Sequence, residues 1–259
     1  MIHGASPRVS DRLRVFVGFS ADEMMATTVA INSMLHFAGT LRLNVQRISR
    51  LSLLQCYTRP TRIDDNGQLW DEISDAPMST DHAIARFFIP WLRDYQGWAL
   101  FTDGDVLCRR DVRELFALAD ERYAVMCVQH PPLLSVGYKK DGDRQLAYPR
   151  KNWSSVMLWN CGHPANRHLT LDTLNGVSGK ALHGFVWLED SQIGALPPEW
   201  NWLVGLSAPV DNPAIVHYTQ GLPTLPDHAH DPYADEWFAQ ARRAGYAVEQ
   251  PPPPLEAAG

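Results

Sequence analysis

Short apolar runs alternate with amphipathic segments along the first half of the chain. Residues 14–19 predict a buried strand, and the apolar positions within 26–37 recur at helical spacing. A second strand is expected over 43–48, where the short apolar pattern returns. A strand, a helix and a strand in this order predict an α/β fold with a parallel sheet and Rossmann-like winding.

The pattern continues to near the end of the chain. Residues 81–95 predict a helix capped by Ser79 or Thr80, whereas 59–78 are rich in turn formers and predict a loop. We expect one domain over 14–248, between a flexible N-terminus (1–13) and a mobile Pro-rich tail (249–259). The remaining elements that we expect are helices over 111–119 and 234–246 and strands over 98–102, 123–128, 156–159 and 214–216.

Composition excludes some classes of function. Acidic residues outnumber basic ones by 29 to 23, and the resulting net charge of −6 argues against a protein that binds nucleic acid. The four cysteines form no CxxC pair, so we expect free thiols in a reducing compartment rather than disulfides or a zinc site. No stretch is apolar enough for a transmembrane segment, and residues 1–14 do not look like a signal peptide. We therefore expect a cytoplasmic protein, and its oligomeric state stays open.

The strand over 98–102 runs into two aspartates, Asp103 and Asp105, separated by Gly104. Open α/β sheets bind their ligands at the carboxyl ends of strands. Two carboxylates this close repel each other, and a hard divalent cation relieves the repulsion and can hold a diphosphate. A bare Asp-x-Asp also occurs as a plain polar turn, so the motif alone leaves both interpretations open.

A histidine follows another apolar run, near the carboxyl end of the chain. His217 comes directly after residues 214–216 and before a turn that contains Gly221. A single histidine is more often structural than a ligand. In a chain with a strand-end carboxylate pair, however, two carboxylates and one imidazole form a ligand set suited to Mn²⁺ or to another divalent ion such as Mg²⁺. Backbone N–H groups around Gly221 can face a phosphate.

Two polar segments and many aromatic residues lie between these motifs. Arg150 and Lys151 open a basic, hydroxyl-rich segment, and Asp190 and Gln192 follow an aromatic run; either segment is also compatible with a solvated loop. The aromatic residues fit either core packing or a sugar-binding surface. They are Tyr148, Trp153, Trp159, Phe185, Trp187, Trp200, Trp202 and Tyr218.

Six short segments, taken in order, resemble GT-A-fold glycosyltransferases related to glycosyltransferase family 8, and bacterial and phage members above all. The resemblance covers residues 14–237 and implies a GT-A fold, a Rossmann-like and mostly parallel sheet flanked by helices. It also implies transfer of a hexose from a nucleotide sugar, commonly a UDP-hexose, with retention of configuration. The segments are Val17-Gly18-Phe19-Ser20, Ala85-Arg86-Phe87-Phe88-Ile89-Pro90, Asp103-Gly104-Asp105, residues 150–160, residues 196–201 and residues 217–223.

The resemblance implies roles for individual residues. Asp103, Asp105 and His217 correspond to the ligands of a metal ion that bridges the donor diphosphate. The strand end Gly18-Phe19-Ser20 corresponds to the nucleoside side of the site, and Arg86 to a basic position near the donor. Asp190 and Gln192 correspond to an Asp-Gln region beside the transferred sugar. Retention would need one of these two as a nucleophile, or else front-face attack guided by the departing phosphate.

The chain departs from the family at three places. Leu222 stands where many members carry a Lys between the late Gly and Pro, so we expect Arg150, Lys151 or the metal to carry more of the diphosphate charge. Ser20 replaces a common Asp, and Trp153-Ser154-Ser155 replaces Asn-(Ala/Ser)-Gly, so a different donor-sugar pocket is expected. The acceptor (a saccharide, a lipid-linked molecule or a protein) is not specified by the sequence.

Two other functions fit parts of the sequence. The run over 101–107 matches the Asp-x-Asp of haloacid-dehalogenase-type phosphohydrolases, whose first Asp is a nucleophile and whose second is an acid/base. That motif normally opens its domain, and His217 would then have no role. The second alternative is a nucleotide-sugar-binding module that has lost its activity. The missing Lys favours this alternative, and the intact Asp103, Asp105 and His217 argue against it.

Overall fold

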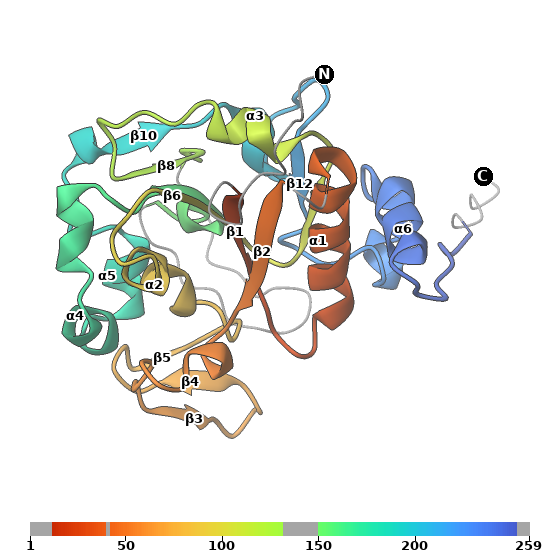
Figure 1. Cartoon of the computed structure of the whole chain (residues 1–259). Helices are drawn as coiled ribbons and strands as arrows, with labels where there is room; N and C mark the ends of the chain where they lie inside the picture. The colour runs from red at the N-terminus through yellow and green to blue at the C-terminus, as the bar shows by residue number, and fades with distance from the viewer. Residues whose placement is uncertain (1–11, 40–41, 132–149, 253–259) are drawn as a thin grey trace, which may run out of the picture.

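A six-stranded sheet forms the centre of the computed structural model, which describes residues 12–39, 42–131 and 150–252 (Figure 1). From one edge to the other, its strands are β10 (Ile193–Ala195), β8 (Val125–Cys127), β9 (Val156–Asn160), β6 (Trp98–Thr102), β1 (Leu13–Gly18) and β2 (Leu43–Ile48). Strands β2, β1 and β6 run parallel to one another, and so do β10 and β8. Only β9, among these strands, is antiparallel to its neighbours. The predicted α/β class with a mostly parallel sheet is confirmed.

Both faces of the central sheet are buried. Successive side chains of a strand point to opposite faces, so a strand covered on both sides is apolar throughout. In β6, Ala99 and Phe101 belong to one apolar cluster and Leu100 belongs to a second cluster. All three side chains are fully buried, which confirms the buried strand predicted before Asp103.

Helices cover the two faces of the sheet. On the side of Leu100 lie α1 (Met24–Ala38) and α3 (Val112–Phe116), and they contribute Met34 and Leu115 to that cluster. The opposite face carries a 3₁₀ helix (Ala85–Phe88), α2 (Ile89–Leu92), α4 (Leu171–Gly176) and α5 (Gly179–His183). None of the helices in the described part of the chain combines the length and the apolar composition that crossing a membrane requires.

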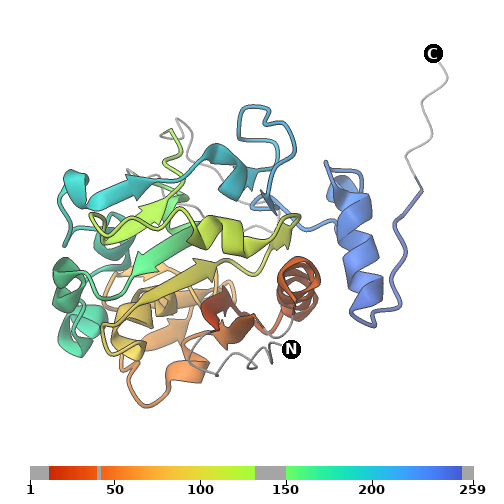
Figure 2. The ribbon, with the colours of Figure 1, turned by 45° about the horizontal axis from the view of Figure 1, so that its top comes forward.

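A second sheet packs against α1. Its three strands are β11 (Trp202–Leu203), β12 (Ile215–His217) and β7 (Val106–Cys108). Helix α6 (Ala234–Arg243) packs Trp237 and Phe238 against Val29 of α1 and Val216 of β12. Figure 2 shows α1 lying between the central sheet and α6. The strand and the helix predicted here are confirmed, with the helix ending at Arg243 rather than at residue 246.

The expectation of a loop over residues 59–78 is wrong. This segment forms a third, antiparallel sheet from three short strands, β3 (Thr61–Ile63), β4 (Leu69–Asp71) and β5 (Ala76–Pro77). The N–H of Asp64 donates to the carbonyl of Gln68 at 2.9 Å, and Gly67 has a positive φ of 81°. Asn66-Gly67 is therefore a hairpin signal. Strands of two or three residues are too short to stand out among so many turn formers.

The expectation of one continuous helix over 81–95 is also wrong. The chain instead forms turns, the 3₁₀ helix Ala85–Phe88 and the short helix α2. Pro90 has no N–H to donate to the carbonyl of Arg86, as a continuous α-helix would require, but it fits the first turn of α2. No side chain caps the start of the 3₁₀ helix, so neither Ser79 nor Thr80 has the predicted role.

The other predicted elements are present with small shifts. Helix α3 is capped by the carboxylate of Asp111, which accepts from the N–H of Arg113, and it ends earlier than predicted, at Phe116. All four cysteines are free and buried, as expected. Most of the predicted flexible segments 1–13 and 249–259 lie outside the described residues, as do Tyr148 and Pro149.

Several of the aromatic residues form one core cluster. Phe87 makes edge-to-face contacts with Trp159, Phe185 and Trp187, at ring centroid distances of 6.5, 6.5 and 6.0 Å. The rings of Trp159 and Trp187 are stacked at 6.3 Å. Phe87, Trp159 and Phe185 are fully buried. For these residues the core-packing interpretation holds, and a sugar-binding surface is not needed to explain them.

We expect Phe87→Ala to lower the free energy of unfolding by about 3 to 5 kcal/mol, because it leaves a cavity between three aromatic rings. Urea denaturation followed by tryptophan fluorescence measures this loss. Phe37→Ala is the matched control, because Phe37 is 42% exposed; its cost should stay within about 0.5 kcal/mol. Equal losses in the two variants would contradict the assignment of Phe87 to the core.

Candidate metal centre and substrate pocket

The pairing of β7 with β12 brings the two sequence motifs together. The chain leaves β6, passes through Asp103-Gly104-Asp105 and enters β7, which pairs antiparallel with β12. In that register Val106 faces His217, and the N–H of Tyr218 donates to the carbonyl of Asp105 at 3.0 Å. Asp105 and His217 are neighbours because of this backbone ladder, although 112 positions separate them in the sequence.

Asp103, Asp105 and His217 form one cluster, in which one ligand atom from each lies within 4.8 Å of the others. Nε2 of His217 is 3.0 Å from Oδ1 of Asp105 and 4.0 Å from Oδ2 of Asp103. The histidine is buried and the two carboxylates are partly exposed. The cluster therefore has a protected side and an open side.

Asp103 is held by two cationic or polar side chains. Nη2 of Arg86 lies 2.8 Å from Oδ1 of Asp103, and Nε2 of His82 lies 3.1 Å from the same oxygen. Burial alone would raise the pKa of Asp103, but the Arg86 guanidinium and His82 hold this pKa well below its usual range. Because both contacts are to Oδ1, Oδ2 is the oxygen of Asp103 that faces His217.

Asn201 orients His217 through a defined hydrogen-bond network. The amide nitrogen of Asn201 lies 2.9 Å from Oγ of Ser155 and 3.0 Å from Nε2 of His130, so its amide oxygen is the acceptor toward His217. Nδ1 of His217 donates to that oxygen at 3.0 Å. In this tautomer Nε2 carries the lone pair and points at the carboxylates, which is the arrangement that metal-binding histidines usually have.

The donor atoms of this cluster fit a divalent cation. With Nδ1 as the donor, Nε2 of His217 and Oδ1 of Asp105 are two electron-rich atoms 3.0 Å apart. They repel each other unless a positive charge, a proton or a metal ion, lies between or beside them. One nitrogen and carboxylate oxygens are ligands suited to Mn²⁺ and related ions.

Glycines let the chain pass through the crowded centre. A Cβ on Gly104 would lie 2.6 Å from both the carbonyl oxygen of Gly18 and Oγ1 of Thr27. A Cβ on Gly18 would lie 2.4 Å from Cδ2 of His82. These two glycines are therefore needed for close packing around Asp103, and their contact with the donor stays a prediction.

The cluster lies in the wall of a pocket of about 400 Å³. The pocket is lined by the metal cluster and Arg86, by Glu23 and Thr219, and by residues 74–80 and α5. This volume falls within the range of small-molecule sites. The pocket therefore has room for a ligand beside the candidate ion.

No family model matches this chain. A curated relative does match it: Protein CDI of Arabidopsis thaliana is 39% identical over 230 residues, which cover 87% of this chain and 84% of the relative. The chain belongs to the Protein CDI family.

Three solved glycosyltransferase structures resemble this Protein CDI family member at low sequence identity. WbbM, a bifunctional glycosyltransferase, has a TM-score of 0.55 at 15% identity and matches 91% of this chain. GlyE of Streptococcus pneumoniae TIGR4 has a TM-score of 0.55 at 17% identity over 89% of this chain. This chain spans only 53% and 61% of those two proteins, but it spans 98% of the galactosyltransferase LgtC, which has a TM-score of 0.54 at 13% identity over 92% of this chain. The fold is a GT-A glycosyltransferase fold.

Seven of the residues predicted from the sequence line this pocket. Arg86 donates through Nη1 to the carbonyl of Ser154 at 2.8 Å, which joins the 3₁₀ helix to the start of β9. The N–H of Asp103 donates to the carbonyl of Ser155 at 2.8 Å. The lining residues that the sequence predicted are Arg86, Asp103, Asp105, Lys151, Ser154, Ser155 and His217.

Other predicted residues stay outside the pocket lining. Ser20 uses its hydroxyl to accept the N–H of Asp81, and the ring of Phe19 lies under the guanidinium of Arg47 at 5.2 Å. Nε1 of Trp153 donates to the carbonyl of His130 at 2.8 Å. A Cβ on Gly221 would lie 2.3 Å from the ring of His228, so this position is one of close packing.

The structure does not bring Asp190 and Gln192 to the pocket either. Both residues precede β10, whereas ligands bind beyond the carboxyl ends of the parallel strands. The side chain of Asp190 is 92% exposed and forms an ion pair with Arg150. The side-chain oxygen of Gln192 accepts the N–H of Glu189 at 2.9 Å. Arg150 is thus engaged outside the pocket, with Asp190 and with the carbonyl of Gly184.

Sequence reasoning missed several residues that build the site. His82 and Asn201 hold the metal cluster, and Asn152, Lys180 and His183 line the pocket. Asn201 ends the segment 196–201, so its place in that motif was a usable signal. Asn152 lies in the segment 150–160, so it too had a usable signal. His82, Lys180 and His183 carry no pattern in the sequence, because only tertiary packing brings them to the site.

Two histidines near the cluster, the buried His130 and the partly buried His183, are neutral. Burial lowers the pKa of His183 to about 3, with Arg86 adding to the effect, and burial lowers the pKa of His130 to about 4. Nδ1 of His183 lies 2.7 Å from Oγ of Ser154. Because the ring is neutral, Nδ1 can accept a hydrogen bond that the hydroxyl of Ser154 donates. The region around the metal cluster therefore contains neutral imidazoles as hydrogen-bonding groups.

We expect the protein to lose stability as the pH falls from about 6.5 toward about 4 in metal-free buffer. In that window the unfolded chain protonates these histidines and the folded chain does not, so the unfolded state binds more protons. Urea midpoints measured between pH 8 and pH 4.5 test this. In His183→Gln the pH slope of the unfolding free energy should be smaller, and an unchanged slope would contradict the assignment.

Proposed function

We propose that this chain is a metal-dependent glycosyltransferase that transfers a hexose from a nucleotide sugar, with a UDP-hexose as the donor. The observation that carries the proposal is the meeting of Asp103, Asp105 and His217 in the wall of one pocket. The GT-A fold supports it, because structures of that fold from three glycosyltransferases resemble this chain. The acceptor is a saccharide, a lipid-linked molecule or a protein.

Asp103, Asp105 and His217 would hold Mn²⁺ or Mg²⁺. When bound, the ion neutralises the charge that builds on the leaving diphosphate. The chain's own contribution is to fix these ligands in place. Asn201 sets the tautomer of His217, while Arg86 and His82 occupy Oδ1 of Asp103 and leave Oδ2 toward the cluster. This reduces the reorganisation needed when the donor binds.

Groups that suit a sugar surround the metal cluster. Ser154 and Asn152 line the pocket, and Ser154 is aligned by His183. Hydroxyl and amide groups in fixed positions can bind the hydroxyls of a hexose. We expect retention of configuration from the family resemblance. A front-face reaction fits the pocket better than a nucleophilic Asp190, because Asp190 and Gln192 are not in its lining.

The phosphohydrolase alternative is disfavoured by the contacts of Asp103. In that mechanism the first Asp attacks phosphorus, but Asp103 is paired with Arg86 and His82 through Oδ1, and its other oxygen faces His217. His217 would also be left without a role beside Asp105. Release of phosphate from simple phosphoesters would revive this alternative. Binding of a UDP-sugar with Mn²⁺ but without hydrolysis or transfer would instead favour an inactive binding module.

We expect Asp105→Asn to abolish Mn²⁺-dependent hydrolysis of UDP-hexoses and Mn²⁺-dependent stabilisation by UDP, with the fold intact. Asp103→Asn should do the same, although it also leaves Arg86 without its carboxylate partner. Thermal shift and UDP release measure the two effects. Asp211→Asn is the control, because Asp211 is exposed and outside the pocket. Near-normal turnover in both site variants would refute the metal role.

Asp190→Asn separates the two possible routes to retention. We expect this variant to keep most of its turnover, because the carboxylate pairs with Arg150 and is 92% exposed. Initial rates of UDP release measure the effect, and Gln192→Ala should behave in the same way. Loss of turnover by about a thousandfold, with UDP binding intact, would show that residue 190 has the catalytic role predicted from the sequence.

A further inference from the structure

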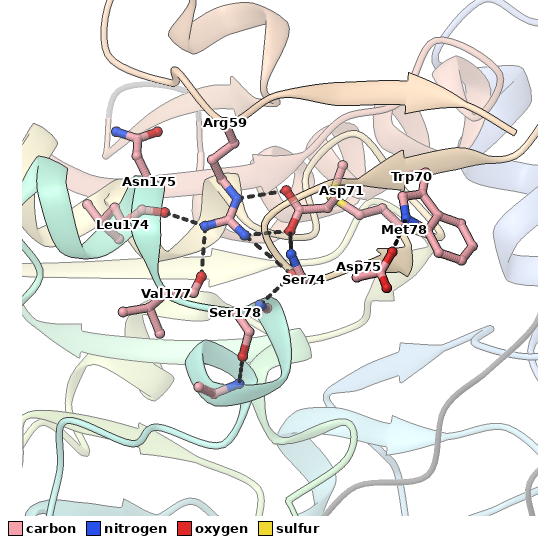
Figure 3. Close-up of polar contacts among 12 residues, drawn as sticks. Arg59, Trp70, Asp71, Ser74, Asp75, Met78, Leu174, Asn175, Val177 and Ser178 are labelled. Atoms are coloured by element: carbon pink, nitrogen blue, oxygen red, sulfur yellow. Dashed lines mark hydrogen bonds and ion pairs between the residues drawn. The ribbon is translucent and has the colours of Figure 1, made fainter.

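A buried ion pair connects the small sheet β3–β4–β5 to the segment between α4 and α5. The side chains of Arg59 and Asp71 have no exposed surface, and they form a double hydrogen bond in which Nε of Arg59 lies 2.9 Å from Oδ1 of Asp71 (Figure 3). Nη1 of Arg59 donates to the carbonyls of Leu174 and Val177 at 2.9 and 2.8 Å. One guanidinium therefore joins β4 to the end of α4.

Ser74 extends this connection to the first residue of α5. Its N–H donates to Oδ2 of Asp71 at 2.9 Å, and its hydroxyl also bonds to that carboxylate. The N–H of Gly179 donates to Oγ of Ser74 at 2.7 Å. A Cβ on Gly179 would lie 2.9 Å from Cδ1 of Ile84, so the start of α5 is closely packed and a side chain there would have to displace Ile84. The start of α5 is thus held at a set distance from residue 74.

Both connected segments line the substrate pocket. Residues 74–80 form part of its wall, and α5 contributes Lys180 and His183. These two residues are three apart, so they lie on the same side of the helix. His183 contacts Ser154, whose neighbour Ser155 accepts the N–H of Asp103. Lys180 therefore lies about one helical turn from the contact that leads to the metal cluster.

The ammonium group of Lys180 is available to an anion. In the ranges 12–39, 42–131 and 150–252 no ion pair of Lys180 is found, whereas Arg86 in the same pocket is paired with Asp103. The pocket lining also contains Asp75, whose carboxylate accepts Nε1 of Trp70 at 3.3 Å. Leu222 packs against the apolar cluster of α6, so the late turn presents an apolar side chain to the core.

We propose that Lys180 binds the diphosphate of the donor, and that Arg59 and Asp71 are positioning residues that hold α5 so that Lys180 reaches it. An ammonium makes strong charge-assisted hydrogen bonds to phosphate oxygens. A buried ion pair contributes little net stability, because the cost of removing both charges from water offsets their attraction. Arg59 and Asp71 can hold the wall of the pocket in position even if their ion pair adds little to the stability of the fold. This inference rests on the proposed function.

Titration of the full-length chain with UDP at saturating Mn²⁺, by calorimetry, tests the role of Lys180. We expect Lys180→Met to weaken UDP binding by about tenfold or more, and Lys180→Arg to restore most of the loss. Mn²⁺ alone should bind Lys180→Met as it binds the wild type. Uridine, which has no phosphate, should bind both proteins equally.

Arg59→Lys tests the positioning role, because it keeps the charge and removes the planar fork. We expect weaker UDP binding in Arg59→Lys and no further loss when Lys180→Met is added, since both changes remove the same contact. Arg109→Lys is the matched control. Arg109 also bonds to a carboxylate, Glu236, through two nitrogens and to a backbone carbonyl, but it lies outside the pocket. Ser74→Ala, which removes the bond to Gly179, replaces Arg59→Lys if that variant does not fold.

The outcomes separate this inference from the proposed function. A wild type that binds no UDP with Mn²⁺ refutes the proposed function. A wild type that binds UDP, with unchanged affinity in Lys180→Met, overturns only the role of Lys180. Additive losses in the double variant, or equal losses in Arg59→Lys and Arg109→Lys, overturn the positioning role.

Discussion

The balance of charge around Asp103 and Asp105 is the constraint on which the site depends. Two carboxylates beside a buried imidazole are unfavourable unless positive charge compensates them. Arg86 and His82 supply part of that compensation on one side of Asp103. On the other side, the lone pair of His217 and the oxygens of the two carboxylates point toward one another. The fold keeps this arrangement in place and leaves its open side toward a pocket, as a site for a divalent cation and an anionic ligand would require.

The backbone explains why the arrangement is rigid. The antiparallel ladder between β7 and β12 sets Asp105 beside His217, and the hydrogen bond from Asp103 to Ser155 continues the ladder between β6 and β9. Gly104 and Gly18 allow the chain to pass where any Cβ would collide. Metal ligands held by two sheets lose little conformational freedom on binding, so their geometry is set before the ligand arrives.

The part of the pocket wall formed by residues 74–80 and α5 is held by side-chain hydrogen bonds and an ion pair rather than by a backbone ladder. There the strands are two or three residues long, and the buried pair of Arg59 and Asp71 joins the segments. The metal cluster and this polar wall line the same pocket. In our inference the donor phosphates are bound through both, by the metal ion and by Lys180.

The local pattern of the sequence was enough for the long elements and for the carboxylate pair. The apolar runs of β1 and β6 predict buried strands, because a strand covered on both faces is largely apolar. The short strands β3, β4 and β5 were not predicted, because two or three residues are too few to show the alternation of apolar and polar positions that marks a strand. The helix expected over 81–95 failed because Pro90 removes a backbone donor inside an otherwise helical pattern.

For the site, the sequence by itself determined which residues could hold a metal ion, namely Asp103, Asp105 and His217. The resemblance to GT-A glycosyltransferases assigned all three to one metal site. Only the tertiary structure decided which other residues join them. Arg59 and Asp71 lie far along the chain from Lys180 and His183, and none of the four belongs to a motif. Asp190 and Gln192 fall outside the pocket lining because they precede their strand. The physical reason is that hydrogen bonds and packing between distant segments, rather than local propensity, determine which side chains share a pocket.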